Sequence, residues 1–135
     1  MIRGTRNQMH NIGNAHQGDT KKVLTVCSAG LLRSATLQNM LIREYGFNVR
    51  NCGTQDYALI PISEALLAWA DEVIFVDKFN YNTVLSYLRY DMTKMIDSFK
   101  KKSFVLNIPD IYNFNDPELV KICKDQYDSK ILYND

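Results

Sequence analysis

The sequence predicts an open α/β domain built on a parallel sheet with helices on both faces. Apolar, β-branched segments alternate along the chain with segments whose apolar residues recur at helical spacing. Strands joined through helices are linked by right-handed crossovers, which make neighbouring strands parallel. Segment 72–77 contains four consecutive apolar residues, 73–76, as expected for a central strand buried on both faces. At 135 residues the chain can bury one such core without disulfides.

The bulk composition excludes several classes of protein. The hydrophobic content of 46% is ordinary for a soluble domain, and no apolar run approaches the roughly 20 residues that cross a bilayer. A net charge of +1 gives no indication of a nucleic-acid or membrane partner. The three cysteines, Cys27, Cys52 and Cys123, lack metal-ligand spacing and suit a reducing compartment. We therefore predict a soluble cytoplasmic protein with no metal or other cofactor.

The first residues of the chain are expected to precede the folded domain. Segment 1–21 is rich in Asn, Gln, Gly, His and basic residues and has almost no apolar periodicity. Such a composition is typical of a flexible tail. The domain is therefore expected to span residues 22–135.

A strand, a loop and a helix open the predicted domain. The β-branched run Val23–Cys27 predicts a buried strand. The helix is predicted over 34–45, and Gly46 is its expected stop. Its apolar positions are Leu37, Met40, Leu41 and Tyr45.

A second strand and a second helix lead to the central strand 72–77. The strand is predicted over 47–53 and the helix over 62–70, where Leu66, Leu67 and Ala70 form an apolar face. The start of this helix is signalled by Pro61, Ser63 and Glu64. Trp69 shares the helix with its apolar face and is expected in the core.

Three helices and one strand complete the domain. Helices are predicted over 81–90 and 92–99, and a fourth strand over 103–108, where Pro109 breaks it. The run Asp116-Pro117-Glu118 combines a capping acid with proline at the first helical position, so it opens a final helix. The buried stripe of that helix is expected to contain Val120, Cys123, Tyr127 and Ile131.

The residues between the first strand and the first helix predict a phosphate-binding loop with its own nucleophile. Cys27 ends a strand of an open α/β sheet, where ligands bind. The loop amides and the start of the following helix favour an anion, and the planar fork of Arg33 matches two phosphate oxygens. The Ser34 hydroxyl can donate to the Cys27 sulfur, which favours the thiolate. The expected phosphate-binding residues are Ser28, Ala29, Gly30, Leu31, Leu32, Arg33 and Ser34. Cys52 and Cys123 are expected to be buried and structural.

The pattern Cys-x5-Arg-Ser, near the start of an α/β chain, resembles the low-molecular-weight protein tyrosine phosphatases. Cys52-Gly53-Thr54 and the segment 70–77 leading to Asn80 are further similarities. Segment 108–120 resembles a bacterial and phage branch of predicted tyrosine phosphatases. The resemblance covers most of residues 22–132. It implies a three-layer sandwich with a four-stranded parallel sheet in the order 2-1-3-4.

The resemblance also implies a chemistry. A phosphotyrosine protein or a small aryl phosphate would be hydrolysed through a phosphocysteine on Cys27, with Arg33 binding the phosphate. Asp110, in Pro-Asp-Ile-Tyr, resembles the family's general acid. Asp116 competes for that role, although helix capping explains it fully. Tyr57 and Tyr112 are the candidates for an aromatic wall against the substrate ring.

The sequence departs from the family at Gly30, where the family carries an asparagine that stiffens the loop. Glycine allows the loop shape, but the side-chain network is expected to be lost. Three alternatives stay open. The loop resembles that of phosphocysteine carriers of the cellobiose-type phosphotransferase system, which lack the arginine. Arsenate reductases of the same fold need two further cysteines close together. A phosphate-binding module without turnover is the third alternative.

Overall fold

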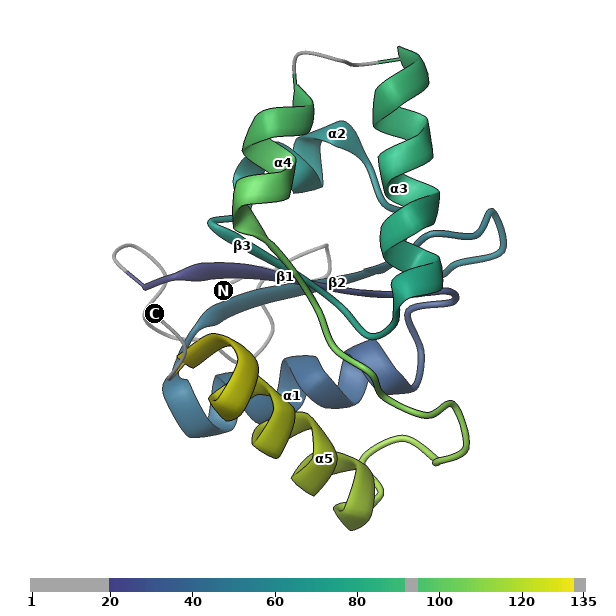
Figure 1. Cartoon of the computed structure of the whole chain (residues 1–135). Coiled ribbons are helices and arrows are strands. Elements are labelled where there is room, and N and C mark those ends of the chain that lie inside the picture. The colour runs from purple at the N-terminus through teal and green to yellow at the C-terminus, as the bar shows by residue number, and fades with distance from the viewer. Residues whose placement is uncertain (1–19, 92–94, 133–135) are drawn as a thin grey trace, which may run out of the picture.

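The computed structural model describes residues 20–91 and 95–132, which form three layers (Figure 1). The middle layer is a four-stranded parallel sheet in the order β2-β1-β3-β4, which confirms the predicted fold class and strand order. Its strands are β1 (Lys22–Cys27), β2 (Asn48–Gly53), β3 (Glu72–Phe75) and β4 (Ser103–Val105). The predicted tail 1–21, apart from its last two residues, lies outside the described residues, as does the start of the predicted helix 92–99.

Two helical layers cover the sheet. Helices α1 (Arg33–Tyr45) and α5 (Pro117–Tyr127) lie on one face, and α5 continues into the π-helical turn η2 (Asp128–Leu132) (Figure 1). On the other face lie α2 (Glu64–Trp69), α3 (Lys78–Asp91) and α4 (Ile96–Lys102). No helix in the described part of the chain has the length and apolar character needed to cross a membrane.

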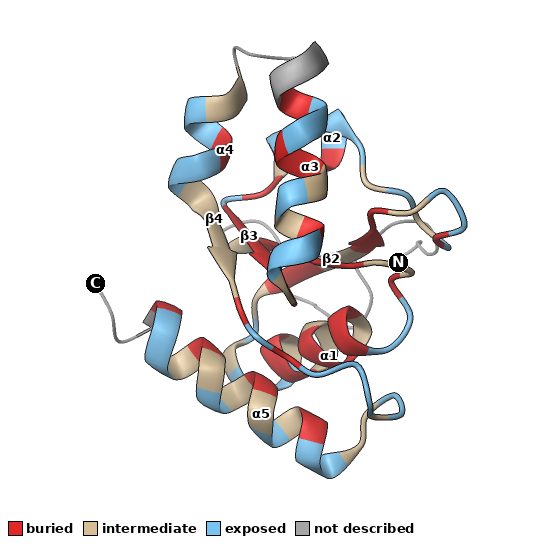
Figure 2. Ribbon diagram, turned by 45° about the vertical axis from the view of Figure 1, so that its right-hand side comes forward, coloured by how far each residue is buried: buried red, intermediate tan, exposed pale blue. Residues whose placement is uncertain are grey.

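The central strand β1 contributes to two cores, one on each face of the sheet. Val23 and Cys27 pack on the α1 and α5 side, whereas Leu24 and Val26 pack on the side of the other three helices. This alternation follows from the two-residue period of a strand. Buried residues accordingly continue from the sheet into the inner sides of the helices (Figure 2). The carboxyl end of β1 is thereby fixed from both faces.

Several predicted boundaries differ from the structure. The fourth strand was predicted over 103–108, but the regular strand ends at Val105. The Leu106 and Ile108 amides still donate to carbonyl oxygens at the end of β3 and just beyond it, at 2.8 and 3.0 Å. The side chains of Leu106 and Ile108 stay in the core although the regular hydrogen-bond pattern of the strand has ended. The apolar sequence pattern therefore extends beyond the strand.

The buried face of α5 differs by one residue from the prediction. Leu119 is fully buried, whereas Val120, predicted in the stripe, is only half-buried. Cys123, Tyr127 and Ile131 are buried as expected. Because one residue turns a helix by about 100°, the core of this short helix can include Leu119 at the expense of its neighbour.

Trp69 is half-buried and does not lie inside the core, which corrects the prediction. It packs against the edge of the core between the sheet and α2. The Arg50 guanidinium of β2 lies over its ring, 4.4 Å from the centroid. This cation–π contact covers one face of the indole.

We expect Leu119→Ala to lower the free energy of unfolding by about 2–5 kcal/mol, because a fully buried leucine leaves a cavity. Val120→Ala is the matched control and should cost about 1 kcal/mol or less. Urea unfolding followed by circular dichroism measures both. Equal losses would contradict the orientation of α5 described above.

Candidate active site

Cys27 ends β1 at the carboxyl edge of the sheet, with only 4% of its surface exposed. Its Sγ accepts hydrogen bonds from the Gly30 amide at 3.0 Å and from the Ser34 hydroxyl at 2.9 Å. Both donors stabilise negative charge on the sulfur. The chain then enters α1, whose N-terminus adds the positive end of a helix dipole. The predicted residues are thus brought together in one turn, here called the cysteine loop (Cys27–Arg33).

The amides of the cysteine loop are available to an anion. Within the described part of the chain, the amides of Ala29, Leu31 and Leu32 donate to no other residue. They belong to the turn that leads into α1, and no side chain caps that helix. Unpaired amides at such a turn are suited to binding phosphate oxygens.

Two glycines let the cysteine loop lie directly against β2. Gly30 has φ +77°, and a Cβ there would lie 3.1 Å from the Cys52 carbonyl carbon. Gly53 faces the loop from the end of β2, where a Cβ would collide with the Ser28 carbonyl oxygen. Three backbone hydrogen bonds join the loop to the segment after β2. They are Thr54 N–H to Cys27 O at 2.9 Å, Gln55 N–H to Ser28 O at 3.1 Å and Leu59 N–H to Ala29 O at 3.3 Å.

Asn51 stiffens the loop from the neighbouring strand. Its Nδ2 donates to the Gly30 carbonyl oxygen at 2.7 Å. The fully buried Thr25 lies beside it, with Oγ1 3.3 Å from Asn51 Oδ1 and 3.0 Å from the Ser34 carbonyl oxygen. The expectation that the loop lacks a stiffening side chain is therefore corrected, because β2 supplies the amide that the loop itself lacks.

Arg33 is buried between carboxylates. Its Nη1 donates to Asp77 Oδ2 at 2.8 Å and to the Ile108 carbonyl oxygen at 3.0 Å. Its Nε lies 3.6 Å from Asp110 Oδ1. Only 8% of the Arg33 side chain is exposed, so these partners compensate a charge that water reaches poorly. They also hold the guanidinium at the carboxyl ends of β3 and β4.

Asn80 connects Asp77 to the cysteine loop. Its backbone amide and its Nδ2 donate to Asp77 Oδ1 at 2.9 and 2.8 Å. Its Oδ1 lies 2.5 Å from Thr54 Oγ1 and 3.4 Å from Ser28 Oγ. Asn80 is fully buried, so a polar chain runs from the loop through Asn80 and Asp77 to Arg33.

The two candidate acids lie in different surroundings. Asp110 is 64% exposed and lies next to Arg33. Asp116 caps α5, and its Oδ1 accepts from the Glu118 amide at 2.9 Å. Between them, Asn115 adopts φ 58° and its amide donates to Thr36 Oγ1 of α1 at 2.9 Å. This bond anchors the segment that carries Asp110 to the helix that follows the cysteine loop.

Large apolar side chains lie exposed on the loop and on the two segments beside it, and we call this set the apolar rim. It comprises Leu31, Leu32, Tyr57, Leu59, Ile111 and Phe114. Tyr57, predicted as a substrate wall, is 69% exposed. Tyr112, the other predicted wall residue, is half-buried, packs on the core and donates to Glu118 Oε2 at 3.2 Å. Its neighbour Ile111 is 77% exposed.

The other two cysteines are fully buried. Burial, together with the nearby Cys27, raises the pKa of the Cys52 thiol, and burial raises the pKa of the Cys123 thiol to about 12. Both thiols therefore stay protonated at neutral pH. Across residues 20–91 and 95–132, no group of three or more His, Cys, Asp and Glu side chains is placed to hold a metal ion.

Comparison with known proteins gives matches among solved structures alone, since no family model and no curated protein matches the sequence. One match is the low molecular weight protein tyrosine phosphatase SP-PTP from Streptococcus pyogenes, at 16% identity and a TM-score of 0.62. The match covers 81% of this chain and 92% of that one. The chain has the low molecular weight tyrosine phosphatase fold.

Further matches share the low molecular weight phosphatase fold. The low molecular weight phosphotyrosine phosphatase VcLMWPTP-2 from Vibrio cholerae O395 is 20% identical, with a TM-score of 0.54 over 77% of this chain and 88% of that one. The arginine phosphatase YwlE from Geobacillus stearothermophilus is 13% identical, with a TM-score of 0.57 over 81% and 86%. The fold that the resemblance implied is thereby confirmed, and proteins with different phosphorylated substrates share it.

Sequence reasoning noted Thr54, Asp77 and Asn80 only as similarities to the family and gave them no role in the site, and it did not find Asn51. Asp77 carried a usable signal, because an acid directly after a buried parallel strand points to the ligand-binding edge. Asn51 lies inside a strand, and its sequence context gave no indication of a role in the site. Its role depends on which strand lies next to β1.

We expect Gly30→Asn, which restores the residue typical of the family, to lower the free energy of unfolding by about 1–3 kcal/mol, because its Cβ would press on the Cys52 carbonyl. Gly46→Asn is the matched control, since Gly46 has φ +69° and no atom lies within 4 Å of an added Cβ. Urea unfolding compares the two variants. If Gly30→Asn proves no less stable than Gly46→Asn, the close contact between loop and β2 is wrong.

Proposed function

We propose that this chain is a phosphomonoesterase that hydrolyses phosphotyrosine or aryl phosphates through a phosphocysteine on Cys27. The observation that carries the proposal is the double hydrogen bond to the Cys27 sulfur, from Gly30 and Ser34, inside a loop that closes on the buried Arg33. A structural cysteine has no need of two polar donors aimed at its sulfur. A nucleophilic thiolate does.

In the first step, the Cys27 thiolate attacks phosphorus. The S–P bond forms as the bond between phosphorus and the aryl oxygen breaks, and Asp110 gives its proton to the leaving oxygen. The loop amides and Arg33 stabilise the charge on the three equatorial oxygens.

In the second step, water attacks the phosphocysteine. The Asp110 carboxylate takes a proton from the water as the new P–O bond forms and the S–P bond breaks. Inorganic phosphate leaves and the thiolate is restored, held by the same two donors as before. Dividing the reaction in this way replaces one difficult displacement with two easier ones.

The apolar rim supports an aryl substrate. Leu31, in the cysteine loop, is 51% exposed, and Tyr57, in the segment that is hydrogen-bonded to the loop, is 69% exposed. Exposed apolar groups around an anion site favour a phosphate that carries a hydrophobic ring. A tyrosine phosphate therefore fits better than the guanidinium phosphate on which an arginine phosphatase acts.

The alternatives fit the site less well. A phosphocysteine carrier must keep its phosphoryl group from water, whereas the exposed carboxyl of Asp110, which lies near Arg33, supports proton transfer and hydrolysis. Arsenate reduction needs a neighbouring pair of cysteines, but Cys52 and Cys123 lie in cores on opposite faces of the sheet. A phosphate-binding module without turnover would require a cysteine loop too flexible to position the nucleophile. The hydrogen bond from Asn51 to the Gly30 carbonyl oxygen restrains the loop and argues against this alternative.

The proposal includes a cytoplasmic location and no cofactor. The mechanism needs a reduced thiol at Cys27, and a reducing compartment maintains it. All three cysteines are free. Every proton transfer is assigned to Asp110 and every oxyanion contact to the loop and Arg33, so the chemistry is complete without a metal.

We expect Cys27→Ser to lower the rate of p-nitrophenyl phosphate hydrolysis at least about a thousandfold, because serine keeps the shape of the side chain but is a far weaker nucleophile. Cys123→Ala removes a different buried cysteine and should retain most of the wild-type rate. Wild-type protein without measurable turnover of p-nitrophenyl phosphate would refute the phosphatase proposal. Phosphoarginine as a parallel substrate tests the preference for aryl esters.

We expect Asp110→Asn to lower kcat for p-nitrophenyl phosphate by about 10²–10⁴, the contribution typical of a general acid. Asp116→Asn should stay near the wild-type rate, because asparagine caps a helix as well as aspartate does. The same steady-state assay compares both variants. A large loss confined to Asp116→Asn would move the proton donor to that residue.

A further inference from the structure

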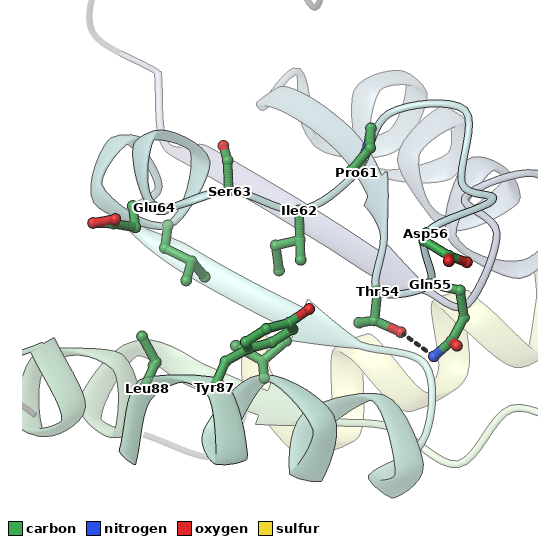
Figure 3. Close-up of a pocket in the computed structure, with 11 residues that line it drawn as sticks. Thr54, Gln55, Asp56, Pro61, Ile62, Ser63, Glu64, Tyr87 and Leu88 are labelled. Carbon is green, nitrogen blue, oxygen red and sulfur yellow. Dashed lines mark hydrogen bonds between the residues drawn. The ribbon is translucent and has the colours of Figure 1, made fainter. Parts of the chain in front are cut away.

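A concave site lies between segment 54–64 and α3 and is here called the α3 cleft (Figure 3). Its volume of about 660 Å³ falls within the range of sites that hold small molecules or side chains. The mechanism proposed above uses none of the side chains that give the cleft its chemical character. The deeper part is apolar and includes Ile62, Leu67, Val84 and Leu88.

Two carboxylates give the α3 cleft its charge. Asp56 lies at one end and Glu64 at the other, and both are exposed (Figure 3). The described residues that line the cleft include no Lys, Arg or His to neutralise them. An occupant that carries positive charge is therefore favoured by both ends.

Tyr87 adds an aromatic surface. It is 57% exposed, and its ring rises from α3 into the cleft toward Ile62 (Figure 3). An exposed ring in a cleft that has a carboxylate at each end suits a group that combines an apolar stem with a cationic head. The stem packs along the ring, and the head gains both a cation–π contact and an ion pair.

The α3 cleft begins next to the cysteine loop. Thr54 lines the cleft, and its hydroxyl lies 2.5 Å from Oδ1 of Asn80, the residue whose Oδ1 is also near Ser28. Gln55, also a lining residue, donates its amide to the Ser28 carbonyl oxygen at 3.1 Å. A peptide anchored by its phosphate at the loop advances about 3.3 Å per residue, so residues close to the phosphorylated one reach the cleft.

We propose that the α3 cleft is a specificity subsite for a lysine or arginine side chain that flanks the phosphotyrosine of a peptide substrate. The proposal rests on the phosphatase function proposed above and specifies its substrates. A free amine of similar size shares the head-group chemistry. It lacks the phosphate anchor, so it binds more weakly than the same group on a phosphopeptide.

The first test compares kcat/KM for phosphotyrosyl peptides that carry either lysine or the uncharged, isosteric norleucine at each flanking position. For wild type we expect a preference for lysine of about tenfold at one or two positions, declining as salt is added. Asp56→Asn combined with Glu64→Gln should abolish the preference and leave p-nitrophenyl phosphate turnover unchanged. Equal preference in variant and wild type, or no preference in wild type, overturns the proposal.

A matched control separates the cleft from overall surface charge. Glu44→Gln combined with Asp97→Asn also removes two exposed carboxylates, but from α1 and α4, which do not line the cleft. This pair should retain the lysine preference. If both double variants lose the lysine preference, the preference comes from the net charge of the protein, and the subsite proposal is wrong. Thermal unfolding checks Glu64→Gln separately, because Glu64 lies in the first turn of α2.

A second test does not depend on turnover. N-acetyl-arginine amide is titrated into ¹⁵N-labelled protein, with N-acetyl-norleucine amide as the neutral probe. We expect the arginine probe alone to shift amide signals of segment 54–64 and of α3 around Tyr87, and to shift none in the Asp56→Asn, Glu64→Gln variant. Absence of these shifts in wild type overturns the cleft proposal. Absence of p-nitrophenyl phosphate hydrolysis overturns the phosphatase proposal, so the two failures are distinguishable.

Discussion

The hydrogen bond from the Gly30 amide to the Cys27 sulfur is the contact on which the carboxyl edge of the sheet depends. It requires the chain to reverse within three residues, which forces Gly30 into the left-handed region. That reversal presses the loop onto Gly53 and the Cys52 carbonyl, so β2 must end without side chains in the way. The environment of the sulfur is therefore built by two neighbouring strands and not by the loop alone.

A second constraint is the balance of charge around Arg33. A guanidinium that is only 8% exposed needs negative partners, and the protein supplies Asp77 at 2.8 Å and Asp110 at 3.6 Å. The two carboxylates differ in how firmly they are held. Asp77 also accepts two hydrogen bonds from Asn80, whereas Asp110 is mostly exposed. An arriving dianion can thus share Arg33 with a fixed partner while the outer carboxyl adjusts to the substrate.

The parts of the site that sequence could predict are those encoded locally. Strand, cysteine, loop, arginine and helix follow one another within residues 23–45, so periodicity and spacing were sufficient there. The layers followed from the alternation of strand and helix patterns, and the strand order from the resemblance. The short β4 and the inclusion of Leu119 in the core depend on tertiary packing, which local pattern does not contain. Asn51 and Asn80 reach the loop from other elements. An asparagine in the sequence could equally belong to an exposed polar surface, so residue type alone did not predict these contacts.

The cation–π pair of Trp69 and Arg50 has a consequence for observing this protein. Trp69 is the one tryptophan of the sequence, so the whole indole emission comes from a single position. Its partner Arg50 directly precedes Asn51, the residue that holds Gly30. Any displacement of β2 that loosens the cysteine loop also moves a positive charge relative to the indole ring. The fluorescence of Trp69 is therefore an intrinsic probe of the position of β2, the strand against which the cysteine loop lies.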